Sequence, residues 1–216
     1  AAQNRVIFIG MNSGKADLET DNVDGKNPFA DVRVRRAMNI AINRDAIRQV
    51  VMRDQSSPTN VIMPPFVNGW TESLDQIPAY DVATAKALMA EAGYGDGFSI
   101  TLNCPNDRYI NDEAICQAAV GMLGQIGVKV NLDAKPKAQH FPMIKNKTTE
   151  FYMLGRGVPT FDSHYIFNFL VHETTENRGS WNNTGYANAD VNAKIVALES
   201  ETDLDKRNGI IGEIWA

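Results

Sequence analysis

Side chains able to recognise a small solute gather in the second half of the 216-residue chain. Arg156 can hold an anion through two parallel hydrogen bonds, and the rings of Phe161 and Trp181 can form apolar walls. Asp162 and Asn182 add hydrogen-bonding groups, although an aspartate at this position can equally cap a helix. Aromatic, amide and charged residues in loops after strands are typical of ligand clefts in open α/β sheets. Packing in a core or against a further lobe stays open as the alternative for the two rings.

Patterns for catalysis, metal binding and nucleotide binding are mostly missing. The sequence has no G-x-S-x-G elbow, no Walker loop and no H-E-x-x-H motif, and Gly155-Arg156-Gly157 lacks the third glycine of a dinucleotide fingerprint. His140, His164 and His172 are not four residues apart, so they do not form a helical two-histidine metal site. We therefore expect no enzyme, no metal and no cofactor. A hydrolase or transferase that uses Asp162 and a histidine is a less favoured alternative, because a recognisable nucleophile is missing.

Composition and charge narrow the class of protein further. Hydrophobic residues make up 44% of the chain and charged residues 22%, which is typical of a folded globular protein. The net charge of −5 argues against a nucleic-acid partner. No run of 18 apolar residues predicts a membrane span, and the first residues do not resemble a signal peptide. We expect either a mature chain or a piece of a longer one.

The two cysteines, Cys104 and Cys116, are twelve residues apart. In an oxidising compartment they could form a disulfide, which would contribute roughly 3 kcal/mol in the chain-entropy model. Two buried free thiols are the alternative, and the sequence leaves both open because it does not give the distance between the side chains.

Apolar periodicity predicts alternating strands and helices. Asp31 and Asp81 are expected to cap helices, and the helix after Arg44 is expected to turn Ile47, Val50 and Val51 inward. The proline-containing segment 56–78 is expected to be irregular. Such alternation predicts an α/β layered fold with a partly parallel sheet. The expected strands are 5–11, 98–103, 128–133 and 151–155, and the expected helices are 31–42, 44–51, 82–92, 111–126, 138–146, 162–171, 189–200 and 207–216.

Several blocks of the chain together resemble family 5 extracellular solute-binding proteins, the dipeptide-, oligopeptide- and nickel-binding components of ABC importers. Each block alone would be a modest signal, but together they cover nearly the whole sequence from about Arg5. The matching blocks are Pro28–Ala37 with Ala41–Ile47, Tyr80–Phe98, Ile126–Val130, Phe151–Gly155 and Trp181–Val191.

The resemblance implies a fold, a task and a location. It implies a lobe of the type II periplasmic-binding-protein fold, a mixed sheet flanked by helices, with residues 1–216 as a single lobe of a larger two-lobed protein. The whole protein would be a periplasmic monomer that captures a peptide or peptide-like solute in an inter-lobe cleft and delivers it to the membrane permease of an ABC importer. A receptor for an opine-like conjugate, an oligosaccharide or a metal chelate is the alternative within the family, and an interaction module for a chemoreceptor is another.

One departure from the family pattern bears on the solute. Peptide-binding members place an aspartate, which pairs with the ligand's α-amino group, shortly after a Gly-Trp pair. Here Arg156 replaces the tryptophan, Pro159 falls at the position of that aspartate, and Asp162 matches a later aspartate that begins the next helix. This departure favours solutes that lack a free amine. Arg156 in turn favours a solute with a carboxylate or another anionic group, which it could bind through two hydrogen bonds.

Overall fold

The computed structural model describes residues 4–23 and 25–216, and its contacts group the chain into two compact units. The first unit contains the chain up to Phe8, Thr59–Ile77 and Gly155–Ala216, and the second contains Ile9–Pro58 and Pro78–Leu154. Within the described residues, no helix combines the length and the apolar character needed to cross a bilayer. That the whole chain forms one lobe of a longer receptor stays a prediction.

The sheet has four strands in the order β1-β4-β2-β3: β1 (Val6–Met11), β4 (Phe151–Arg156), β2 (Phe98–Pro105) and β3 (Val128–Lys135). β2 pairs in parallel with β3 along its whole length and with β4 near Asn103. Asn12 N donates to the Glu150 carbonyl, and the Asn4 side chain exchanges hydrogen bonds with the Val158 backbone, so β1 runs antiparallel to β4. The sheet is therefore mixed, as expected from the sequence.

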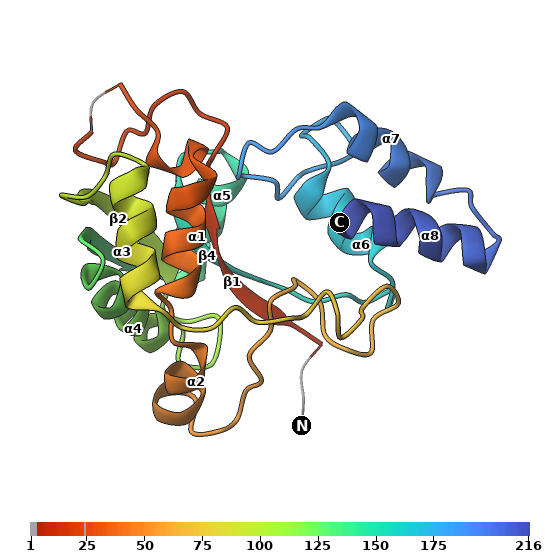
Figure 1. The fold of residues 1–216 in the computed structure, drawn as a ribbon. Coiled ribbons are helices and arrows are strands. Elements are labelled where there is room, and N and C mark those ends of the chain that lie inside the picture. The colour runs from red at the N-terminus through yellow and green to blue at the C-terminus, as the bar shows by residue number, and fades with distance from the viewer. Residues whose placement is uncertain (1–3, 24) are drawn as a thin grey trace. The chain divides into compact units, whose positions relative to one another are not determined.

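Helices of the second unit pack beside this sheet (Figure 1). α1 (Val32–Ile40) lies next to α3 (Val82–Glu91), and α4 (Asp112–Gly124) packs against β2 and β3. The unit also contains α2 (Arg44–Ala46), which continues as a π-helical turn over Ile47–Val51, and α5 (Lys137–Lys145).

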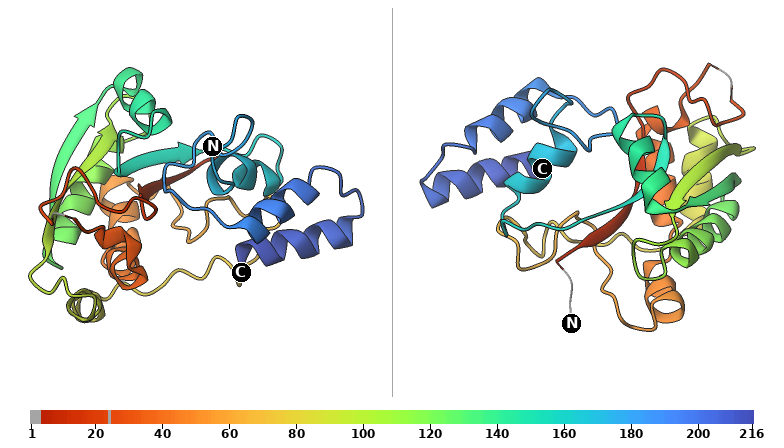
Figure 2. Two further views of the ribbon diagram at one scale, coloured as in Figure 1. Left: turned by 90° about the horizontal axis from the view of Figure 1, so that it is seen from above. Right: turned by 180° about the vertical axis from the view of Figure 1, so that it is seen from behind.

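The first unit carries the C-terminal helices, which Figure 2 shows from two further sides. They are α6 (His164–Ile166), which continues as a π-helical turn over Phe167–Val171, α7 (Ala189–Ala197) and α8 (Leu204–Trp215). Phe167 lies at the centre of their core, with its ring centroid 4.9 Å from that of Trp215. The other fully buried members of this core are Ile195, Leu198 and Ile211.

The structure confirms the two predicted helix caps, Asp31 and Asp81. The inward orientation predicted for Val50 is wrong. The Asp31 carboxylate accepts a hydrogen bond from Arg33 N at 2.8 Å, and Asp81 accepts one from Thr84 N at 2.9 Å. Val50, however, is 77% exposed instead of pointing inward. Because the π-helical turn adds a residue per turn, the apolar spacing of an ordinary helix does not hold there.

Two glycines of the resembling blocks meet where β2 and β3 begin. Gly97 and Gly127 both have positive φ values, 75° and 86°, which a residue with a Cβ rarely adopts. A Cβ built on Gly97 would also overlap the backbone carbonyl of Gly127. These glycines therefore allow the two strand entries to approach backbone to backbone, which is a structural role.

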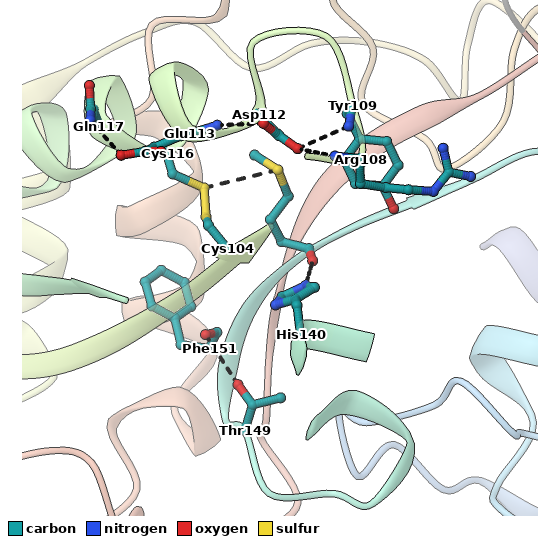
Figure 3. Close-up of a disulfide and its surroundings, with 11 residues drawn as sticks. Cys104, Arg108, Tyr109, Asp112, Glu113, Cys116, Gln117, His140, Thr149 and Phe151 are labelled. Atoms are coloured by element: carbon teal, nitrogen blue, oxygen red, sulfur yellow. Dashed lines mark hydrogen bonds between the residues drawn. A yellow bond between two sulfur atoms is a disulfide. The ribbon is translucent and has the colours of Figure 1, made fainter. Parts of the chain in front are cut away.

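A disulfide joins Cys104 of β2 to Cys116 of α4 (Figure 3). Both cysteines are completely buried, and the Cys116 sulfur lies 4.0 Å from Met153 Sδ in β4. Of the two alternatives left open by the sequence, the structure contains the bridged one, which ties α4 covalently to the sheet.

Candidate functional site

Arg156, the last residue of β4, extends its guanidinium group among three aromatic rings of the first unit. Its Cζ lies 5.1 Å from the ring centroid of Tyr165, 4.9 Å from that of Phe169 and 5.6 Å from that of Trp181. Nη2 also donates a hydrogen bond of 2.8 Å to the Tyr165 hydroxyl. At these distances the ring faces attract the cation, and we call the three rings the aromatic clamp.

The clamp is assembled from one helical segment and one loop. Tyr165 and Phe169 are four residues apart on α6 and the π-helical turn that follows, and their ring centroids are 4.8 Å apart. Trp181 comes from the glycine-containing loop 179–185, and its backbone N–H donates to the Phe169 carbonyl at 3.0 Å. Four residues are slightly less than one π-helical turn, so the two rings still lie on the same side of this segment.

Only part of the Arg156 guanidinium is used by the protein. Within the described residues, its single hydrogen bond is the one to Tyr165. Nε is sealed from solvent without a partner, whereas Nη1 is not among the sealed atoms. Nη1 is therefore a donor that the described residues leave unused.

The Asp162 carboxylate is fully engaged by neighbours in its own unit. Arg207 donates to it at 2.7 and 3.1 Å, the His164 backbone N–H at 2.9 Å and the Asn68 side chain at 3.1 Å. Burial alone would raise the pKa of Asp162, but the hydrogen bonds from Arg207, His164 and Asn68 together hold it below its ordinary value. Asp162 thus joins the start of α6 to α8.

Asn182 is buried, and its amide group is used within its own surroundings. Its Nδ2 donates to the carbonyls of Val171, His172 and Tyr186 at 3.2, 3.0 and 2.8 Å. Its Oδ1 accepts two hydrogen bonds from Thr184, at 2.8 and 3.2 Å. These contacts tie the loop that carries the clamp's tryptophan to the end of the π-helical turn.

Phe161 lies on the surface in a strained backbone conformation. Its φ is +54°, its side chain is 54% exposed, and its ring centroid is 5.9 Å from that of Phe66, which is 52% exposed. A bulky residue with positive φ is a true outlier, and such strain is concentrated at functional positions. That Phe161 forms a wall of a ligand site stays a prediction. Phe66 lies in the irregular segment 56–78, and the sequence did not predict that it pairs with Phe161.

A cavity of about 330 Å³ in the first unit borders the clamp. His164 Nε2 and Asn168 Oδ1, from two of its lining residues, are buried without a hydrogen-bond partner. Burial, reinforced by the charge of Arg207, lowers the pKa of His164 below its ordinary value, so this imidazole is neutral at pH 7. The lining residues are Thr160, Asp162, His164, Tyr165, Asn168, Phe169 and Arg207.

The structure brings two of the five predicted ligand residues, Arg156 and Trp181, into direct contact. Asp162 and Asn182 are used to hold the surrounding chain, and Phe161 lies on the surface. Ligand contact stays a prediction for all five. Among the described residues, no group of three or more histidine, cysteine, aspartate or glutamate side chains could hold a metal ion.

Comparisons with known proteins identify relatives and a fold. The chain is 27% identical over 199 residues to the glutathione-binding protein GsiB of Salmonella typhimurium strain LT2. The alignment covers 88% of this chain and 38% of that protein. HbpA2 from Haemophilus parasuis superposes with a TM-score of 0.81 at 20% identity, over 97% of this chain and 39% of that one. A dipeptide-binding protein from Pseudoalteromonas sp. SM9913 in complex with Met-Leu superposes with a TM-score of 0.80 at 22% identity, over 98% and 40%.

The two structural likenesses show that the fold is that of periplasmic binding proteins of type II. The chain spans about two fifths of the length of each of these three proteins. The family model for bacterial extracellular solute-binding proteins, family 5 Middle, matches residues 1–178, and the chain therefore belongs to the family 5 extracellular solute-binding proteins.

Proposed function

We propose that this chain is part of the solute-binding component of an ABC importer and that it captures a peptide or peptide-like small solute reversibly. No bond is made or broken in this task. Within a family of solute-binding proteins, the observation that carries the proposal is Arg156, whose guanidinium is held by three rings while Nη1 stays free for a ligand. The rest of the binding surface would come from outside the residues matched here.

In this proposal Arg156 binds a carboxylate of the solute, and Trp181 and Phe161 contact its apolar parts. A guanidinium pairs well with a planar carboxylate because two N–H groups can donate in parallel. Asp162 and Asn182 act indirectly, because their hydrogen bonds hold the loops that carry the contacting side chains.

Ligands named for two similar proteins agree with this chemistry. Glutathione, which GsiB is named for, and Met-Leu, which is bound in the Pseudoalteromonas structure, both carry a free carboxylate. A solute without a free α-amine is the alternative within the family, and Pro159, at the position expected for an amine-binding aspartate, favours it.

The proposed partner is the membrane permease of an ABC importer, and the proposed location is the periplasm. The buried disulfide supports this location, because disulfides persist in oxidising compartments. We also propose that the receptor acts as a monomer, without a nucleic-acid partner.

The test uses the complete protein that contains this chain. Native mass spectrometry after purification without denaturant should detect a co-purifying peptide or peptide-like mass, and calorimetry should then give its affinity. Arg156→Ala should weaken binding about tenfold or more, because a buried charge-assisted pair is lost. Arg178→Ala is the matched control, since Arg178 forms an exposed ion pair with Glu199 in the same unit. Turnover of the solute, or equal affinities of the wild type and Arg156→Ala, would contradict the proposal.

A further inference from the structure

Two phenylalanine residues of the first unit place their rings side by side on its surface. Phe66 and Phe161 are 52% and 54% exposed, and their ring centroids are 5.9 Å apart with 49° between the ring planes. We call these two residues the phenylalanine pair. The two rings contact each other, but about half of each residue still meets water. This surface is available to an apolar group that binds from outside.

Hydrogen bonds between two distant segments hold the phenylalanine pair in place. Asn68 N–H donates to the Phe161 carbonyl at 2.9 Å, and Ser163 N–H donates to the Asn68 carbonyl at 3.1 Å. The Asn68 side chain adds a hydrogen bond of 3.1 Å to the Asp162 carboxylate. Because the backbone under the rings is already ordered, binding against them costs less conformational freedom than binding against a mobile segment.

The backbone of Phe161 adopts a conformation that does not suit its own side chain. Its φ of +54° favours glycine or asparagine, and a bulky side chain is rare there. Because the residue is also half in water, burial in a core does not explain why a phenylalanine occupies this position. Strain of this kind is concentrated at functional positions, and a binding role accounts for the ring.

The neighbours of Phe161 in the sequence line the cavity beside the aromatic clamp. Thr160 and Asp162 belong to this lining, together with Tyr165 and Phe169 of the clamp. A solute that occupies the cavity therefore lies beside the backbone that carries the Phe161 ring. The phenylalanine pair is thus continuous along the chain with the lining of the candidate site.

The size of the phenylalanine pair indicates what kind of group can cover it. A phenylalanine side chain buries about 150–250 Å² when it is fully enclosed, so two half-exposed rings offer about 200 Å². A stable protein–protein interface needs about 800 Å² from each partner. The pair is therefore too small to hold a protein or a second copy by itself, and it matches the area of one bulky apolar side chain.

We infer that Phe66 and Phe161 form a subsite for a bulky apolar side chain of the solute, and that Phe66 is a specificity-determining residue. An apolar group that covers the rings removes its own surface and theirs from water, so affinity should rise with the size of that group. The inference rests on the proposed function and deepens it, because it names a part of the solute that is selected.

The test compares three acetylated dipeptides on the complete protein that contains this chain. N-acetyl-Ala-Ala, N-acetyl-Phe-Ala and N-acetyl-Ala-Phe share a free carboxylate and a blocked amine. They differ only in the presence and position of one phenyl ring. Calorimetry should show that at least one of the two phenyl-containing dipeptides binds about tenfold tighter than N-acetyl-Ala-Ala.

Phe66→Ala and Phe161→Asn should each bring this affinity ratio close to one. Asparagine suits the positive φ, so the urea midpoint of Phe161→Asn should change little while the ratio falls. Phe66→Leu keeps an apolar side chain, should give an intermediate ratio and serves if Phe66→Ala does not fold. Tyr186→Ala is the matched control, because it removes a 40% exposed ring of the same unit outside the pair and should leave the ratio unchanged.

Equal affinities for the three dipeptides in the wild type would overturn the inference. So would an unchanged ratio in folded Phe66→Ala and Phe161→Asn, or binding of a co-purifying solute by a protein that binds none of the three dipeptides. Failure of the proposed function gives a different result: the complete protein would bind neither the dipeptides nor any co-purifying mass, which would remove both proposals.

Discussion

The replacement Asp162→Asn tests whether this aspartate holds the first unit together. The amide keeps an oxygen that can accept from His164 N–H, so the loss is concentrated in the two charge-assisted hydrogen bonds from Arg207, at 2.7 and 3.1 Å. Hydrogen bonds to charged groups contribute about 1.5–3 kcal/mol each. Because the side chains of Arg207 and Asp162 are still 17% and 21% exposed, solvent screens the pair, and we expect a loss of about 2 kcal/mol in the free energy of unfolding, below the sum for two fully buried bonds.

The expected pH dependence has a definite sign. The pKa of Asp162 is lower in the folded state than its ordinary value of 3.8. Its contribution to stability is therefore fully present above that ordinary value and is lost as the pH falls through the lower folded value. The difference in stability between the wild type and Asp162→Asn should shrink in the same range.

Urea unfolding at neutral pH and at about pH 3 measures both effects. Glu199→Gln is the matched control. The side chains of Arg178 and Glu199 are 27% and 40% exposed, more than those of Arg207 and Asp162. We therefore expect Glu199→Gln to lower the free energy of unfolding by at most about 1 kcal/mol. A loss below about 0.5 kcal/mol for Asp162→Asn at neutral pH, or an equal loss at both pH values, would refute the assigned role.

Three further changes test the second unit by the same unfolding measurement. Glu150→Gln should lower the free energy of unfolding by about 2 kcal/mol, because the Glu150 side chain is only 2% exposed and loses its ion pair with Lys15. An unchanged urea midpoint would contradict this expectation. Replacing Cys104 and Cys116 together by serine should lose about 3 kcal/mol, and adding reductant to the unfolded wild type before refolding should give a similar loss. Gly97→Ala should lose at least about 2 kcal/mol, because its φ is +75° and a Cβ would meet backbone; equal stability would show that the two strand entries can separate.

Much of the fold follows from local patterns in the sequence. A single side chain next to a periodic apolar stretch was enough to place the caps Asp31 and Asp81. Local patterns failed where an extra residue enters the helical turn, as Val50 shows. The strand order β1-β4-β2-β3 depends on contacts between distant segments, which periodicity does not report.

The candidate site was predicted less completely, for a similar reason. Arg156 and Trp181 were recognised by residue type, and their contact joins positions 25 residues apart. Phe169 was missed although its four-residue spacing from Tyr165 was visible in the sequence. The partner of Asp162 is 45 residues downstream, so nothing local separates a ligand-binding carboxylate from one already bound.

The contacts of Arg156 within the protein include favourable and unfavourable ones. Contact with the rings contributes about 0.5–2 kcal/mol, and the hydrogen bond from Nη2 to the Tyr165 hydroxyl adds to this. Sealing Nε without a partner costs about 1–3 kcal/mol. These contacts leave Nη1 without a partner among the described residues, and it is this donor that the proposed pairing with a solute carboxylate would use.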